Sequence, residues 1–69
     1  MSTETLMAKK LKELRNIKGL TQDGMAIFLK IKRSNLGSYE EGRAMPDVFL
    51  FLDICRRTHT DPFWFTKED

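Results

Sequence analysis

Residues 21–46, TQDGMAIFLKIKRSNLGSYEEGRAMP, decide the fold of this 69-residue chain. Apolar residues recur at helical spacing on both sides of a short break at residues 30–32: Met25, Ala26, Leu29, Leu36 and Tyr39. Thr21 is a suitable N-cap for the first of these helices, and Ile31 is placed to plug the corner between them. Two short helices joined by so tight a break form a helix-turn-helix unit, which we place at about residues 21–40.

The helix predicted at residues 33–40 has an outward face unlike that of an ordinary surface helix. Its outward residues are basic, short or able to hydrogen-bond: Arg33, Ser34, Asn35, Gly37 and Ser38. In a helix-turn-helix the second helix lies in the major groove of DNA, while the first crosses the phosphate backbone. That groove, roughly 12 Å wide, accepts a helix whose outward side chains are slim or bond to base edges. The pattern therefore predicts binding to double-stranded DNA.

Two segments carry a resemblance to a known family. LKELRNIKGLTQ (residues 11–22) and MAIFLKIKRSNLGSYEEGRAMP (residues 25–46) follow, without a gap, the pattern of the Cro/CI-type (XRE-type) helix-turn-helix regulators. The chain resembles this family in the Gly-Leu-Thr-Gln run, the alanine five residues after the threonine, and the later Tyr-Glu-x-Gly run. The resemblance implies a lambda-repressor-like DNA-binding domain that acts as a sequence-specific transcriptional regulator, with repression as the expected outcome.

The resemblance also implies roles for individual residues, carried over by position. Arg33, Ser34, Asn35 and Ser38 are then expected to read bases, and Gln22, Lys32 and Arg43 to contact phosphates. Arg33 has the geometry for two hydrogen bonds to guanine, worth about 1–3 kcal/mol of discrimination. Arg15 and Glu40 match positions that form a partly buried, structural ion pair.

Two departures from the family pattern carry their own expectations. Lys30 stands where the family has glycine in the turn, so it must take a positive φ, at a cost of about 1–2 kcal/mol. Lys32 replaces the usual Ser/Thr cap of the reading helix, so we expect the cap of that helix to be weakened.

The rest of the chain reads as three further helical segments. Thr3 or Thr5 is a suitable N-cap for the first, which ends before Gly19 and has its lysines, including Lys10, on the solvated face. Another opens at Met45-Pro46-Asp47, with proline suited to its first turn. The last begins near Thr60. Residues 1–69 are thus predicted to form a single all-α domain, a compact bundle of about five short helices.

Apolar residues near the C-terminus exceed what so small a core needs. The set that we assign to a possible dimer surface is Phe49, Leu50, Phe63 and Trp64. A large exposed apolar patch marks an interface in many proteins. Two explanations remain open at this point: a contact between two copies of the chain, or a surface covered by further chain beyond the sequence.

Composition excludes several classes of function. Residues 1–43 hold nine Lys/Arg and five Asp/Glu, whereas residues 44–69 hold three against five, so the basic half suits a polyanion. One cysteine (Cys55) and one histidine (His59) cannot build a zinc site, and no catalytic pair or phosphate-binding loop is present. We expect no enzymatic activity, metal, cofactor, small-molecule substrate or membrane span, and a cytoplasmic location. The alternative is a protein-interaction module on the same fold, such as an antitoxin or an antagonist of another regulator.

Overall fold

A computed structural model of the chain describes residues 3–68. Four α-helices, α1 (Thr3–Ile17), α2 (Gln22–Leu29), α3 (Arg33–Glu40) and α4 (Val48–Thr58), are followed by a single 3-10 turn, η1 (Pro62–Thr66). This confirms the all-α class and corrects the expected five helices to four. In η1 the Asp61 carboxylate accepts from the Phe63 N–H, and the next five residues complete only one tight turn.

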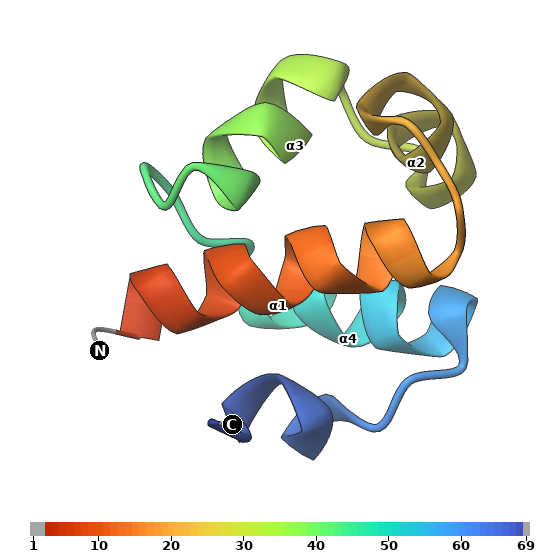
Figure 1. Cartoon of the computed structure of the whole chain (residues 1–69). Helices are drawn as coiled ribbons and strands as arrows, with labels where there is room; N and C mark the ends of the chain where they lie inside the picture. Colours follow the sequence, from red (N-terminus) through yellow and green to blue (C-terminus); the bar gives the residue numbers. More distant parts are fainter. Residues whose placement is uncertain (1–2, 69) are drawn as a thin grey trace.

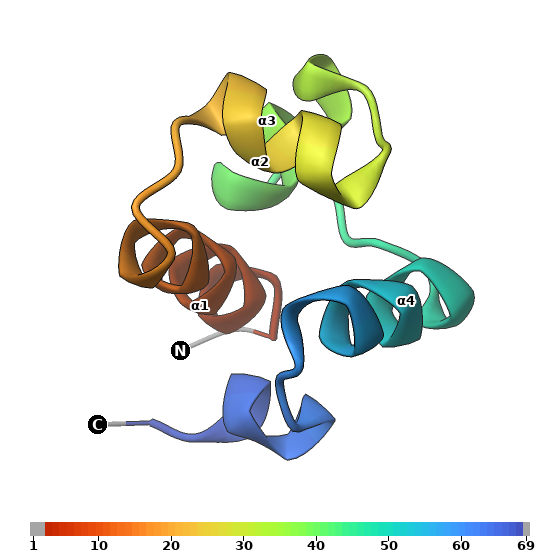
Figure 2. The ribbon, with the colours of Figure 1, turned by 90° about the vertical axis from the view of Figure 1, so that its right-hand side faces the viewer.

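The helices surround α1, which runs through the middle of the molecule (Figure 1). α2 and α3 lie on one side of α1, α4 lies beside it, and η1 lies on the side away from α3 in both views (Figures 1 and 2). α1 packs against both α3 and η1, and α2 packs against α3. In the described part of the chain, no helix has the length and apolar character needed to cross a bilayer.

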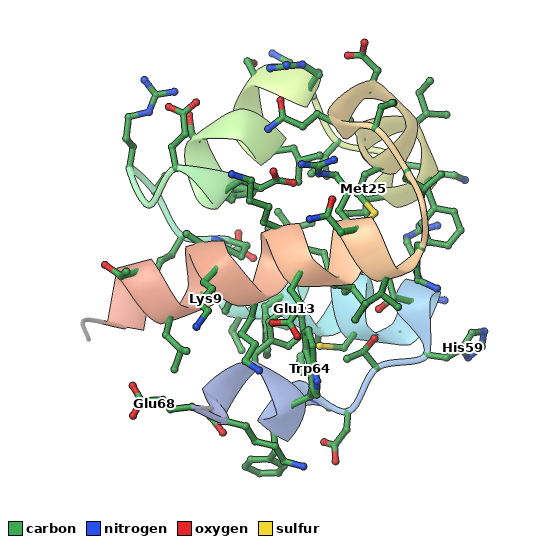
Figure 3. All side chains as sticks on the ribbon, in the orientation of Figure 1. Lys9, Glu13, Met25, His59, Trp64 and Glu68 are labelled. Atoms are coloured by element: carbon green, nitrogen blue, oxygen red, sulfur yellow. The ribbon has the colours of Figure 1, made fainter. Side chains whose placement is uncertain are left out.

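The core consists of the apolar stripes of these helices facing one another. Its fully buried side chains are Leu11, Met25, Leu29, Leu36 and Ile54. Figure 3 shows Met25 directed from α2 toward α1, so the helix-turn-helix unit is tied to the core through its first helix. Cys55 is buried here as a small hydrophobe, and burial raises the pKa of its thiol.

The side-chain caps explain where α2 and α4 begin. Thr21 Oγ1 accepts from the Gly24 N–H at 3.0 Å and starts α2, as predicted. At α4 the cap is Asp47, which accepts from the Leu50 N–H at 2.8 Å. Pro46 therefore precedes the cap, and the expectation that it lies in the first turn is wrong. A carboxylate satisfies a free N–H group of the first turn, which proline does not.

The first helix needs two corrections. α1 already includes Thr3, so Thr5 is not its cap, and the residue before Thr3 lies outside the described residues. Lys10 is buried, at 3% exposed, instead of lying on the solvated face. Its Nζ lies 4.7 Å from the centroid of the Trp64 ring, and Trp64 reaches from η1 to α1 in Figure 3. A desolvated ammonium over an indole face is stabilised by the ring quadrupole.

Candidate nucleic-acid interface

The outward face of α3 is open to solvent over its first turn. Arg33, Ser34 and Asn35 are exposed, and Ser38 is half-buried one turn further on. α3 lies at the edge of the molecule away from η1 (Figure 1). Four of the side chains predicted to read bases thus share the exposed side of one short helix, with Arg33 the longest of them.

The inward face of α3 is held by an ion pair. Arg15 Nε donates to Glu40 Oε2 at 2.8 Å, and the Glu40 side chain is 1% exposed. Arg15 Nη1 also donates to the Leu20 carbonyl at 2.9 Å. One arginine therefore ties the end of α3 to the end of α1 and to the loop before α2. The predicted pairing of Arg15 with Glu40 is present.

Gln22 is shared between this cluster and the surface. Its Nε2 donates to Glu40 Oε1 at 3.0 Å, so both carboxylate oxygens of the buried Glu40 have a partner. The sequence assigned Gln22 to phosphate alone and did not indicate this bond. An amide nitrogen carries two N–H groups, so the bond to Glu40 uses only one of the donors of Gln22.

The turn between α2 and α3 has the geometry that the sequence required. Lys30 ends α2 in the left-handed region, at φ 59° and ψ 43°. The Ile31 N–H donates back to the Ala26 carbonyl at 3.0 Å, which closes the turn, and Ile31 packs half-buried against the core. Lys32 precedes α3 and provides no side-chain cap, in line with the expected weakening. Its exposed ammonium lies at the N-terminus of α3.

Arg33 lies against two residues that the sequence did not connect with it. Its Nε is 3.3 Å from Asp23 Oδ1, across the turn on α2. Its Nη1 lies over Gly37, where an added Cβ would come within 3.4 Å. Gly37 is thereby covered and counts as buried, which corrects its expected place on the outward face. The sequence did contain a signal for this contact, because it has an acidic residue in the first turn of α2 and an arginine at the first position of α3.

Arg43 lies just beyond the end of α3. Its Nη2 lies 3.0 Å from Glu41 Oε1 in an ion pair. The same nitrogen donates a hydrogen bond to Ser38 Oγ at 3.5 Å. Arg43 is thus close to Ser38, which is predicted to read bases. An acidic neighbour within ion-pair distance also lowers the net positive charge on this side of the molecule.

The apolar residues near the C-terminus divide into two groups. Phe49 and Phe63 are 82% and 73% exposed, whereas Leu50 and Trp64 are half-buried and pack against the core. Phe63 helps to line a groove of about 440 Å³, which is formed by the start of α1, the loop before α4, α4 itself and η1. We call Phe49, Phe63 and this groove the apolar face.

Known proteins support the helix-turn-helix assignment. Residues 6–62 match the model of a helix-turn-helix domain family. The chain is 44% identical over 43 residues to the SPbeta prophage-derived HTH-type transcriptional regulator YonR of Bacillus subtilis (strain 168), covering 62% of this chain and 40% of YonR. It is 30% identical over 66 residues to the HTH-type transcriptional regulator YgzD of the same organism, covering 91% of this chain and all of YgzD.

Solved structures agree with these sequence matches. An HTH_3 family transcriptional regulator from Vibrio cholerae superposes with a TM-score of 0.81 at 26% identity, over 90% of this chain and 35% of that one. The restriction-modification controller protein C.AhdI from Aeromonas hydrophila gives the same TM-score and identity, over 90% of this chain and 94% of its own. The fold and the sequence matches define a helix-turn-helix domain whose second helix, α3, is exposed over its first turn. The chain belongs to the Cro/CI-type (XRE-type) family of helix-turn-helix transcriptional regulators.

Proposed function

We propose that this chain binds a specific double-stranded DNA sequence by placing α3 in the major groove, and that it represses transcription from the site it occupies. The observation that carries the proposal is the outward face of α3. Arg33, Ser34 and Asn35 are exposed together on a helix whose other face is fixed to α1 by the Arg15–Glu40 pair. Repression needs only occupancy of the DNA, whereas activation needs a further contact with the transcription machinery.

The proposed division of labour follows the position of each residue around α3. Side chains on its exposed face read bases: Arg33, Ser34, Asn35 and Ser38. Side chains at its ends and on α2 contact phosphates: Gln22, Lys32 and Arg43. Phosphate contacts supply affinity for any duplex and make it fall with salt, whereas contacts to base edges supply the discrimination.

Two arginines allow a matched test of this division. Selection of bound duplexes from a random pool first defines the preferred site. Arg33→Ala is then expected to lose about 1–3 kcal/mol of discrimination at one base pair of that site. Arg43→Ala should weaken binding to all duplexes alike and reduce the salt slope by about one. Both are measured by fluorescence anisotropy across a range of salt concentrations.

The outcomes separate the proposal from its alternative. If Arg33→Ala keeps full discrimination, the assignment of Arg33 is wrong. If the unaltered protein binds no duplex even at low salt, DNA binding itself is wrong, and the protein-interaction module becomes the better explanation.

We also propose that two copies bind together through the apolar face. A two-fold interface uses the same patch on both partners, so the patch must hold both a projection and a recess. Phe49 projects from α4, Phe63 projects from η1 where it lines the groove, and the groove offers the recess. In the described structure η1, which forms part of this face, lies on the side of α1 away from α3, so pairing leaves α3 open to DNA (Figure 2). A dimer that engages one duplex with both reading helices must hold them about one DNA turn, roughly 34 Å, apart, and the spacing of the selected half-sites tests this.

Light scattering at increasing protein concentration, with and without the selected duplex, tests the pairing. Dimers are expected for the unaltered protein, and Phe49→Ser should weaken them while the exposed position leaves the fold intact. A monomer under all conditions would remove the proposed pairing without affecting DNA binding by a single copy.

A further inference from the structure

We propose that Asp23 is a specificity-determining residue that positions the guanidinium of Arg33 for base reading. This inference rests on the proposed function, because it concerns how the same site discriminates between sequences. It assigns Asp23 a role that neither its place in the first turn of α2 nor its charge indicates on its own. Three features of the outward face carry it: the atoms in contact, the room left by Gly37, and the exposure of both partners.

The contact involves the end of the guanidinium that base reading does not need. Asp23 Oδ1 lies 3.3 Å from Nε, the nitrogen nearest the side-chain stem. A guanidinium carries five N–H donors, and four of them belong to the two terminal nitrogens. Recognition of guanine takes two donors, one for O6 and one for N7. Asp23 can therefore hold the arginine while the terminal nitrogens engage a base.

Gly37 supplies the room for this position. The Nη1 atom of Arg33 lies over the backbone one turn further along α3, and a Cβ at residue 37 would already be 3.4 Å from it. A longer side chain at residue 37 would occupy the same space. Glycine lowers the helix propensity of α3. The residue with the least steric bulk thus lies under the arginine that we expect to read the base.

Exposure distinguishes positioning from a structural role. The side chains of Asp23 and Arg33 are 81% and 56% exposed, so the pair contributes little to folding. Its effect is on the free arginine, which otherwise samples many rotamers and loses that freedom when it binds a base. Holding it in one place before binding reduces that loss. The Asp23 carboxylate also repels the negatively charged phosphates of DNA. This repulsion lowers the affinity for duplexes that place no guanine opposite Arg33.

The test compares two acidic residues that each lie within ion-pair distance of an arginine near α3. Asp23→Asn and Glu41→Gln each remove one negative charge while keeping the size of the side chain. Glu41 is the matched residue because its carboxylate lies 3.0 Å from the guanidinium of Arg43. Each variant and the unaltered protein are titrated with three duplexes. The first is the selected duplex, the second is the same duplex changed at the base pair where Arg33→Ala loses discrimination, and the third has a random sequence. Thermal unfolding confirms that both variants stay folded.

Asp23→Asn is expected to bind the random duplex more tightly and to lose about threefold to tenfold of its discrimination at the Arg33 base pair, which is part of what Arg33→Ala loses. Glu41→Gln is expected to strengthen binding to all three duplexes by the same factor and to leave discrimination unchanged. If Asp23→Asn behaves like Glu41→Gln, Asp23 acts only as a charge and the inference is overturned. If Arg33→Ala itself keeps full discrimination, the proposed base reading fails first, and the role of Asp23 fails with it.

Discussion

α3 has an arginine–carboxylate pair on each of its two faces, and the two pairs differ in nearly every other respect. On the inward face Arg15 and Glu40 meet at 2.8 Å with the carboxylate buried and fully bonded. On the outward face Arg33 and Asp23 lie 3.3 Å apart with both side chains open to solvent. The same chemical groups fix the helix in one place and remain available to a ligand in the other. Burial decides which role a pair has.

The physical reason lies in the cost of desolvating charge. Once Glu40 is buried, removal of its arginine leaves a carboxylate with only Gln22 as a partner, and water cannot replace what is lost. An exposed pair behaves differently, because each charge regains its hydration when the other is removed. The inward pair should therefore affect stability, and the outward pair should affect DNA discrimination.

The largest predicted effect follows from breaking the inward pair. Arg15→Ala is expected to lower the free energy of unfolding by about 3–5 kcal/mol, the usual cost of leaving a buried charge unpaired. Arg33→Ala should change it by less than about 0.5 kcal/mol, as most exposed substitutions do. Urea unfolding followed by circular dichroism measures both. Similar losses for the two variants would show that burial does not separate the pairs.

A domain of this size has little stability to lose, so a milder variant is also needed. Arg15→Lys keeps the charge, but one ammonium cannot make the bonds that the guanidinium makes to both Glu40 and the Leu20 carbonyl. It should fall between the unaltered protein and Arg15→Ala. If Arg15→Lys is as stable as the unaltered protein, the planar guanidinium is not needed at this site.

The sequence predicted the scaffold of α3 well because that scaffold depends on local rules. The apolar spacing gave α2 and α3, Thr21 has the expected cap, and a lysine in the place of glycine implied the positive φ at Lys30. The resemblance to a family supplied the pairing of Arg15 with Glu40, which are 25 positions apart and which no local pattern connects.

Features that depend on tertiary contacts were missed. Lys10 looks like a surface lysine until Trp64 packs over it from the other end of the chain. Gln22 looks free until Glu40 is placed beside it. The contact of Arg33 with Asp23 depends on the angle at which α2 meets α3, which the turn sets. In each case the missing information is which side chains the helix packing brings together.

The turn itself provides a prediction of intermediate size. Lys30→Gly removes the penalty for a side chain in the left-handed region and should raise the free energy of unfolding by about 1 kcal/mol. His59, which ends α4 at φ 54°, gives a matched control, and His59→Gly should stabilise by a similar amount. Because the turn keeps its shape, Lys30→Gly should leave discrimination between duplexes unchanged. Denaturant unfolding and duplex titration are both needed.

An opposite result at the turn would be informative. A destabilised Lys30→Gly variant would mean that the gain in unfolded-state entropy for glycine exceeds the strain relieved. Altered discrimination would mean that the turn, in addition to the outward face of α3, contributes to reading.

The smallest effect concerns a further arginine–carboxylate cluster, on α4, which extends the comparison to a partly exposed helix surface. Hydrogen bonds from Arg57 and then Arg56 hold the pKa of Asp53 below its ordinary value. Since the folded pKa is lower than the unfolded one, near 3.9, the contribution of Asp53 is complete above about pH 5 and is lost as the pH falls through both values.

Asp53→Asn should therefore slightly reduce the thermal midpoint at pH 7, and the difference should shrink as the pH falls below about 4. Asp61→Asn is unsuitable as a control because Asp61 caps η1. Glu41→Gln, which removes an exposed acid outside α4, is the better control. A drop at pH 7 as large as that of Arg15→Ala would show that an exposed cluster can match a buried pair. Burial would then not decide how strongly an arginine–carboxylate pair stabilises the fold, and the distinction between the two faces of α3 would be wrong.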